Sequence, residues 1–412
     1  MNKPAVWTID GEVGAEEIAV VGEMVLVPLE TSLVAVDRVT GQQRWRRDQK
    51  IADGGWFRYR IRGELIVLYE GRAASDDPIL VEVIEAATGR TRWQGSSHRV
   101  NVYGDAVYQT DCTGLGTRDV QCTTMRRAIG DGKPTWPHPA TGTLGDDVIG
   151  NWHQLAPPES EYLPVWLGPS TPVPSDRPWG LVATATGNVL PGRGPSHAWY
   201  AFSAGDLLVI TNHDRDEYRC EIGLEAISGP TGTRQWEKPV HAGRYKDKDA
   251  CRKRLSGSEQ SQMIGSGSRI AAVTADRTPQ LFDLATGSTV WAAAERGSPI
   301  DGDERSLLVG EFADQGALSL LDLETGAKKW SIPDPGFSPH PSERNTFLVG
   351  DRVVVGATIR MGNSGGPAVI VYDRETGREV DRYVGYLQGA GADWVAVLVT
   401  EYGKPDTIQF HG

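Results

Sequence analysis

Cysteine is scarce in this 412-residue chain, and the motifs that build the commonest catalytic centres are missing from it. The sequence has four cysteines and eight histidines. No histidines are spaced as in a zinc-binding helix motif, and no Gly-x-Ser-x-Gly nucleophile elbow occurs. The pattern therefore excludes these two centres, while a catalytic set assembled from distant segments stays an alternative.

Long apolar runs and excess positive charge are also lacking. No segment approaches the roughly 18 apolar residues needed to cross a bilayer, and the net charge of −12 opposes general nucleic-acid binding. The N-terminal segment from Met1 to Pro4 has no signal-peptide core. We expect either a cytoplasmic protein or an extracytoplasmic one whose export segment, and any membrane anchor, lies outside this chain.

The four cysteines bear on that choice because they fall into two local pairs. Cys112 and Cys122 flank a short loop between two expected strands, whereas Cys220 begins a strand and Cys251 lies in the loop that follows the same repeat. Pairs of this kind favour the disulfides Cys112–Cys122 and Cys220–Cys251, and hence an oxidising compartment. Four unpaired buried thiols are the alternative.

What the chain does contain is a repeat. Seven Thr-Gly pairs occur, and five are followed by a tryptophan five residues after the threonine. The pairs are Thr40-Gly41, Thr88-Gly89, Thr186-Gly187, Thr231-Gly232, Thr286-Gly287, Thr325-Gly326 and Thr376-Gly377; the tryptophans are Trp45, Trp93, Trp236, Trp291 and Trp330. An aspartate stands three residues before four of the threonines, as Asp37, Asp283, Asp322 and Asp373. A recurring local pattern of this kind indicates a repeat protein.

Each repeat specifies a hairpin. Leu33 to Asp37 is a short apolar strand, Thr40-Gly41 supplies a tight turn, and the strand that follows carries Trp45. The tryptophan is large enough to wedge between neighbouring sheets. Two further β-rich runs precede each hairpin, and four strands in roughly 40 to 45 residues are typical of a β-propeller blade.

The two ends of the chain complete the count. Trp7 is placed as if it ended a blade whose beginning is missing, and the segment from Trp394 to Phe410 supplies such a beginning. We therefore predict one all-β domain over residues 1–412: an eight-bladed β-propeller of four-stranded antiparallel blades, closed by pairing the N-terminal strand with the C-terminal strands. Seven or nine blades are the alternatives.

Residues 97–196 complicate this count because they contain two possible hairpins. One surrounds Gly130-Asp131-Gly132, with Trp136 after it, and the other is Thr186-Gly187. Nine prolines lie between residues 156 and 195, and proline lacks the donor that a central strand needs. We expect a blade over about 97–138 and a Pro-rich insertion over about 139–196, in which Thr186-Gly187 is not a true repeat.

The motif Asp-x-x-Thr-Gly-x-x-x-Trp resembles the pyrroloquinoline-quinone-type repeat, and the layout of the whole chain is similar to the BamB type of propeller. The resemblance implies a propeller fold, and it covers both quinone-dependent dehydrogenases and non-catalytic scaffolds. Dehydrogenases of this type use a vicinal cysteine pair and calcium ligands in the central funnel. This sequence has no Cys-Cys dipeptide, so we expect no quinone cofactor.

The candidate binding surface is the face on which the long connections lie. Connections within blades (71–78, 111–119, 212–219 and 358–367) and between blades (46–56, 139–196, 239–261 and 333–343) vary in length, and in a four-stranded meander both types emerge on one face. Loops held by a rigid scaffold are common binding sites. The candidate residues there are Arg244, Lys246, Arg252, Lys253 and Arg254 (a basic segment in an acidic protein), the aromatic and histidine residues Trp152, His153, Trp166 and Trp179, and the loop residues His213 and Arg360.

A solvated loop or packing against the propeller would also explain each of these groups. The segment from Asn212 to Glu217 offers oxygen ligands but not the spacing of a calcium loop, so we expect no metal. The function that this pattern favours is a monomeric, non-catalytic scaffold or ligand-binding or sensor domain outside the cytoplasm, with another protein or an anionic small ligand as its partner. An enzyme with a site in the central funnel, such as a lyase or a hydrolase, is the alternative.

Overall fold

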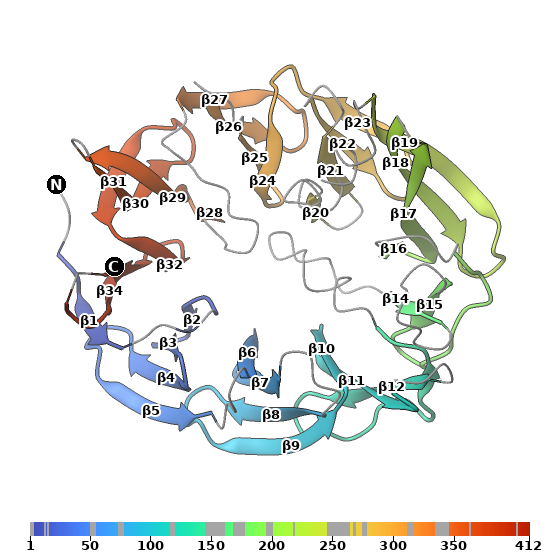
Figure 1. The fold of residues 1–412 in the computed structure, drawn as a ribbon, viewed down its shortest axis with the longest axis horizontal. Coiled ribbons are helices and arrows are strands. Elements are labelled where there is room, and N and C mark those ends of the chain that lie inside the picture. The colour runs from blue at the N-terminus through green and yellow to red at the C-terminus, as the bar shows by residue number, and fades with distance from the viewer. Residues whose placement is uncertain are drawn as a thin grey trace.

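A computed structural model shows a ring of antiparallel sheets around a central opening (Figure 1). It describes residues 4–11, 14, 16–49, 55–72, 78–115, 120–144, 161–167, 178–194, 201–216, 219–244, 264–266, 269–273, 278–310, 317–333, 346–361, 364–400 and 403–412. These residues contain strands and no helix. None of the described segments is therefore a helix long and apolar enough to cross a membrane.

Eight of the sheets have four strands, which confirms the predicted eight four-stranded blades. Four of them are β2–β5 (Ala19–Val21, Met24–Leu29, Ser32–Asp37, Gln43–Asp48), β6–β9 (Gly55–Arg62, Leu65–Arg72, Ile79–Glu85, Thr91–Ser97), β10–β13 (Arg99–Tyr103, Ala106–Thr113, Gln121–Ala128, Ala140–Thr141) and β16–β19 (Ala201–Ala204, Leu207–Asp216, Arg219–Ser228, Arg234–Arg244). Three more are β20–β23 (Ile264–Ser266, Arg269–Val273, Pro279–Asp283, Thr289–Ala292), β24–β27 (Ser298–Gly302, Ser306–Gly310, Ala317–Asp322, Lys328–Pro333) and β28–β31 (Thr346–Val349, Arg352–Met361, Ser364–Asp373, Glu379–Val384). The first strand of each sheet lies nearest the central opening (Figure 1).

The eighth sheet joins the two ends of the chain. Its order is β1–β34–β33–β32, formed by β1 (Trp7–Asp10), β34 (Thr407–His411), β33 (Val395–Val399) and β32 (Tyr386–Ala390). Trp7 lies opposite Phe410 in the register, and their rings stack with centroids 4.7 Å apart. Pairing the first strand with the last in this way completes the fourth strand of this blade.

The Asp-x-x-Thr-Gly motif forms the turn between the third and fourth strands. In the first repeat, Asp37 Oδ1 accepts hydrogen bonds from the backbone N–H of Thr40 at 2.8 Å and from its hydroxyl at 2.9 Å. Gly41 closes the turn with a φ of 70°, and its N–H donates to the carbonyl of Asp37 at 2.9 Å. Because the carboxylate bonds the turn internally, this aspartate serves the fold rather than a ligand.

The repeat tryptophans pack against the turn of the next blade. The indole ring of Trp45 packs on Gly89 of the following sheet, where an added Cβ would lie 2.9 Å from the ring, and its Nε1–H donates to the carbonyl of Ala86 at 2.7 Å. The equivalent carbonyls accept from Trp7, Trp93, Trp136, Trp291 and Trp330. Trp236 packs on Gly287 in the same way, although its buried Nε1 has no hydrogen-bond partner among the described residues.

The two kinds of short turn lie side by side on one face. The N–H of Arg38, in the Thr-Gly turn, donates to the carbonyl of Glu23, in the turn between β2 and β3, at 2.9 Å. In the next blade, the N–H of Ala86 donates to the carbonyl of Glu64 at 2.8 Å. We call this the turn face, and we call the opposite face, where second and third strands connect, the hairpin face.

A two-stranded sheet is the element that the sequence interpretation did not include. It consists of β14 (Tyr162–Trp166) and β15 (Trp179–Ala183), and it lies between β10–β13 and β16–β19 in the ring (Figure 1). Thr186-Gly187 makes the usual turn after β15: Gly187 has a φ of 78° and receives the Trp136 ring, and Thr184 O accepts the Trp136 indole N–H at 2.7 Å. The prediction that Thr186-Gly187 is not a true repeat was therefore wrong.

The many prolines in this region led to the wrong prediction, but few of them lie within strands. Pro164 is the only proline within β14 and β15, while Pro178 precedes β15 and Pro191 follows the turn, so the ladder loses few donors. The blade expected at 97–138 is present as β10–β13. Trp136 lies outside its strands, however, and the fourth strand has only Ala140 and Thr141.

Candidate functional site

The hairpin face carries two pairs of strands that are longer than the others. β17 and β18 pair over ten residues, from Leu207↔Ser228 to Asp216↔Arg219, and β29 and β30 pair over ten, from Arg352↔Asp373 to Met361↔Ser364. The corresponding pairs β21–β22 and β25–β26 have five. At about 3.3 Å per residue the long hairpins extend roughly 15 Å further.

These hairpins correct two of the predicted loops. Residues 212–216 and most of 358–367 were expected to be irregular, but Asn212 pairs with Gly223 and Thr358 with Pro367. Polar residues and glycines suggested loops, yet an antiparallel pair satisfies its own backbone groups and tolerates such residues where the strands face solvent. The glycine-rich segment from Gly365 to Pro367 is likewise part of β30.

Most of the predicted binding side chains lie outside the described residues. Lys246, Arg252, Lys253, Arg254, Trp152 and His153 belong to that group. Arg244 ends β19, His213 lies in β17 and Arg360 lies in β29, and their side chains are outside the description. Their role in binding stays a prediction.

Trp166 and Trp179 are described, and they lie opposite each other in the two-stranded sheet. Their rings contact edge to face with centroids 4.8 Å apart. Trp179 is only 1% exposed and packs with Leu208 and Ile210 of the following blade. In this structure the side chain of Trp179 fills the junction between two sheets.

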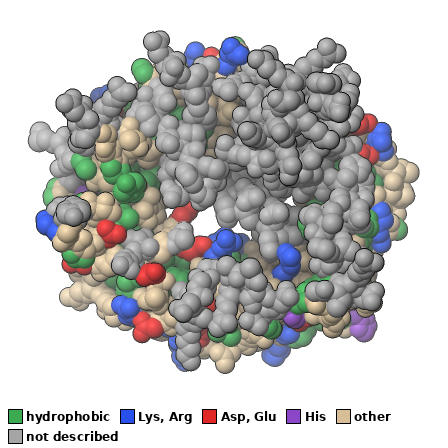
Figure 2. Space-filling model, viewed as in Figure 1, with side chains coloured by type: hydrophobic (Ala, Val, Ile, Leu, Met, Phe, Trp, Pro, Cys, Tyr) green, Lys and Arg blue, Asp and Glu red, His purple; other side chains and the backbone are tan. Residues whose placement is uncertain are grey.

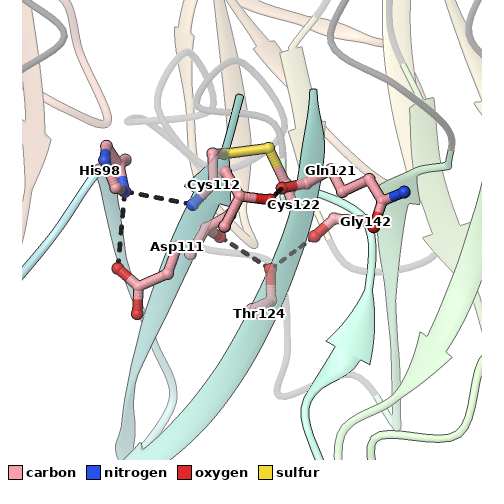
Figure 3. The surroundings of a disulfide bond; sticks show 9 residues. His98, Asp111, Cys112, Gln121, Cys122, Thr124 and Gly142 are labelled. Carbon is pink, nitrogen blue, oxygen red and sulfur yellow. Dashed lines mark hydrogen bonds and ion pairs between the residues drawn. A yellow bond between two sulfur atoms is a disulfide. The ribbon is translucent and has the colours of Figure 1, made fainter. Parts of the chain in front are cut away.

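One predicted disulfide is present near the end of the β11–β12 hairpin. Cys112 and Cys122 are directly opposite in the register and are bonded to each other. The Nδ1 atom of His98 accepts the N–H of Cys112 at 3.1 Å and lies 3.6 Å from Asp111 Oδ1 (Figure 3). Cys220 begins β18, but its side chain and the whole of Cys251 are outside the described residues, so their pairing stays a prediction.

A cluster of charges lies at the inner edge of the ring, on β6. Arg58, Arg60 and Arg62 alternate along this first strand and so share one face, while Phe57 and Tyr59 on the other face are buried against β2–β5. Glu16, just before β2, reaches two of them: its Oε1 lies 3.6 Å from Arg58 Nε, and its Oε2 lies 3.2 Å from Arg60 Nη1. We call Glu16, Arg58, Arg60 and Arg62 the rim cluster.

Backbone carbonyls hold Arg62 in place. Its guanidinium donates to the carbonyls of Gly104 at 3.1 Å, Val102 at 3.2 Å and Ile61 at 2.8 Å, which ties β6 to β10 and its turn. Figure 2 shows basic and acidic side chains at the edge of the central opening, on the side where Figure 1 has β6 and β10.

Burial perturbs the charges of this cluster. Desolvation raises the pKa of Glu16 above its ordinary value, although Arg60 and Arg58 oppose this effect. Burial also lowers the pKa of the Arg62 guanidinium, and repulsion from Arg60 acts in the same direction. Tyr59, whose hydroxyl donates to the carbonyl of Glu17, has a pKa raised by burial and by Glu16.

The sequence interpretation missed the rim cluster although a signal for it was present. The segment from Arg58 to Arg62 alternates arginine with Tyr59 and Ile61, and such alternation is typical of a strand with one buried face. What the sequence could not supply was the position of this strand beside the central opening, which depends on the closed ring.

Ligating side chains do not gather into a metal site among the described residues. No group of three or more His, Cys, Asp or Glu side chains is close enough among them to hold a cation. The described disulfide joins residues ten positions apart rather than a vicinal pair.

Comparisons with known proteins agree with the fold. A family model described as outer membrane protein assembly factor BamB matches residues 184–332 and 221–393, which together span just over half of the chain. No curated protein matches the sequence. A solved eukaryotic initiation factor is 12% identical over 94% of this chain and 89% of its own, with a TM-score of 0.51.

Two further solved structures are similar at lower TM-scores. BamB from Moraxella catarrhalis is 15% identical over 99% of both chains, with a TM-score of 0.45. A quinohemoprotein alcohol dehydrogenase from Comamonas testosteroni is 14% identical over 99% of this chain and 76% of its own, with a TM-score of 0.48. Identities this low bear on the fold alone.

Proposed function

The chain belongs to the family described as outer membrane protein assembly factor BamB, and from this premise we propose that it is a non-catalytic scaffold outside the cytoplasm. In this proposal its hairpin face binds a partner protein. The observation that carries the proposal is the contrast between the two faces of the ring. At the turn face, indole-to-carbonyl hydrogen bonds join neighbouring blades at most described junctions. At the hairpin face, the strand pairs β17–β18 and β29–β30 extend beyond the others.

The turn face is poorly suited to adapt to a partner. Its two kinds of turn bond each other, and the indole donors and turn carboxylates are already used within the fold, as for Trp45 with Ala86 and for Asp37 with Thr40. The long hairpins at the opposite face offer strands and tips that the ring does not need for closure. Rigid scaffolds commonly bind through segments of this kind.

The disulfide supports a site of action outside the cytoplasm. It joins β11 to β12 towards the hairpin face, and disulfides persist mainly in oxidising compartments. It also holds the end of a third hairpin on the proposed binding face. A partner would therefore meet a surface that is partly fixed before binding, which lowers the entropy cost of association.

Site-specific photocrosslinking from the hairpin tip would test this proposal. A photoreactive residue replaces Arg360 near the tip of β29 in the full-length protein, and a second variant carries it at Arg90 on the turn face. We expect one crosslinked partner from position 360 and none from position 90. Crosslinking from both positions alike, or from position 90 alone, would show that the wrong face was chosen.

A shortened hairpin provides the second arm. Residues 360–365 are replaced by Asn-Gly, which keeps the Ile359↔Gly366 pair, whose Gly366 N–H can close the turn, and the bond from Gly385 N–H to Pro367 O at 3.0 Å. Circular dichroism should show an unchanged sheet content, while partner binding should fall. Full binding by the folded, shortened variant would exclude this hairpin from the interface.

A further inference from the structure

The rim cluster has more positive than negative charge, in a protein whose net charge is −12. It places three guanidinium groups around one carboxylate. Glu16 pairs with Arg58 and Arg60, and its side chain is only 18% exposed. The carboxylate is thus already held between two arginines, and Glu17 is the next acidic group that acts on it.

Arg62 is the unbalanced member. Its guanidinium donates to three backbone carbonyls, and none of the described carboxylates is bonded to it. Carbonyl dipoles orient the guanidinium but do not cancel its charge. Arg60, two residues away on the same face of β6, adds repulsion. Like charges in a partly desolvated site favour the entry of an anion.

The positions of these side chains are fixed before any ligand arrives. Arg62 donates to a backbone carbonyl of β10. Arg60 donates to the carbonyl of Tyr59 at 2.8 Å, and the side chain of Tyr59, in the same strand β6, is buried. Arg60 is 28% exposed and so keeps part of its guanidinium open to solvent. A planar guanidinium held in this way suits the oxygens of phosphate or carboxylate groups.

We propose that the rim cluster binds a small oxyanion carrying two or more negative charges, held by Arg60 and Arg62 at the edge of the central opening. Two guanidinium groups, those of Arg60 and Arg62, favour an anion with more than one negative charge. Phosphate and polycarboxylate share the chemistry that these guanidinium groups recognise. This site is distinct from the hairpin face of the proposed scaffold function and does not depend on it.

Calorimetric titration of the full-length protein tests the proposal, with inorganic phosphate and citrate as separate probes. Sodium chloride is adjusted to the same ionic strength throughout. We expect saturable binding of at least one probe, and comparison of the two decides between a phosphate and a carboxylate ligand. Heats no larger than those of the chloride blank for both probes would overturn the proposal.

Three variants separate a binding site from general electrostatics. Arg60→Gln should weaken binding about tenfold through the loss of a charge-assisted contact. Glu16→Gln should strengthen it, because it removes the competing carboxylate, and damage to the fold does not produce a gain. Arg90→Gln is the matched control, since Arg90 is 71% exposed on the turn face and pairs with Glu85 at 2.8 Å. Equal losses in Arg60→Gln and Arg90→Gln, or weaker binding in Glu16→Gln, would refute the site.

Discussion

Replacing Gly89 with alanine should destabilise the ring more than the same replacement at Gly63, although both residues lie in turns of one blade and both have positive φ angles. The φ is 66° at Gly89 and 58° at Gly63. An added Cβ at Gly63 meets nothing within 4 Å, whereas at Gly89 it lies 2.9 Å from Trp45 Cδ2 and 3.0 Å from Cγ. The pair therefore separates backbone strain from the close approach of the indole ring.

The two costs can be worked out from these contacts. The left-handed conformation costs alanine about 1 kcal/mol at either position. At Gly89 the ring must also move, because carbon atoms pack best at roughly 3.5 to 4.0 Å. Moving it weakens the 2.7 Å hydrogen bond from Trp45 Nε1 to Ala86 O, worth about 1 kcal/mol. Lost aromatic packing adds about 1 kcal/mol, so we expect about 3 kcal/mol for Gly89→Ala and about 1 kcal/mol for Gly63→Ala.

Denaturant unfolding of a double-mutant cycle measures this difference. Gly89→Ala is made in the natural protein and in a Trp45→Ala variant. The variant lacks the indole ring that the added Cβ would displace. In that background its cost should fall to the value seen for Gly63→Ala. Equal costs at Gly89 and Gly63 in the natural protein would refute the idea that the glycine makes room for the tryptophan.

Two further predictions concern single bonds. Replacing Cys112 and Cys122 together by serine should lower the free energy of unfolding by about 2 to 3 kcal/mol through the greater freedom of the unfolded chain. Dithiothreitol should lower that of the natural protein by at least as much, and no loss in the double variant would contradict this prediction. Arg374→Ala should cost about 2 to 3 kcal/mol, because Arg374 is 1% exposed and its guanidinium bonds Asp303 at 2.5 Å. Burial acts to raise the pKa of Asp303, but Arg374 and two backbone N–H groups outweigh it and lower that pKa. The pair therefore stabilises the fold above the ordinary carboxyl pKa of about 4 and loses its effect as the pH falls below it, so a pH-independent difference between the two proteins would contradict this assignment.

The fold was predictable because its determinants are local and repeated. Asp37, Thr40 and Gly41 bond one another within five residues, so their pattern in the sequence reports the turn directly. The closing sheet could be predicted from Trp7 for the same reason, since a tryptophan near the start of a strand marks the fourth strand of a blade. The binding surface was less accessible to prediction, because a polar segment such as 212–216 can form either a loop or an extended hairpin.

The missed two-stranded unit shows which part of the junction can persist when the tryptophan is absent. The segment after Gly187 forms only isolated bridges and has no tryptophan among residues 188–194; instead the backbone N–H of Gly192 donates to the carbonyl of Gly229 at 2.6 Å. Gly229 precedes its Thr-Gly pair by the same distance as Ala86 precedes Thr88-Gly89, so the same carbonyl accepts in both junctions. A Cβ on Gly192 would lie 2.3 Å from the carbonyl oxygen of Ser228, which explains why glycine stands there. The acceptor carbonyl is thus used at junctions with and without tryptophan, and a search for tryptophan alone undercounts the units of such a ring.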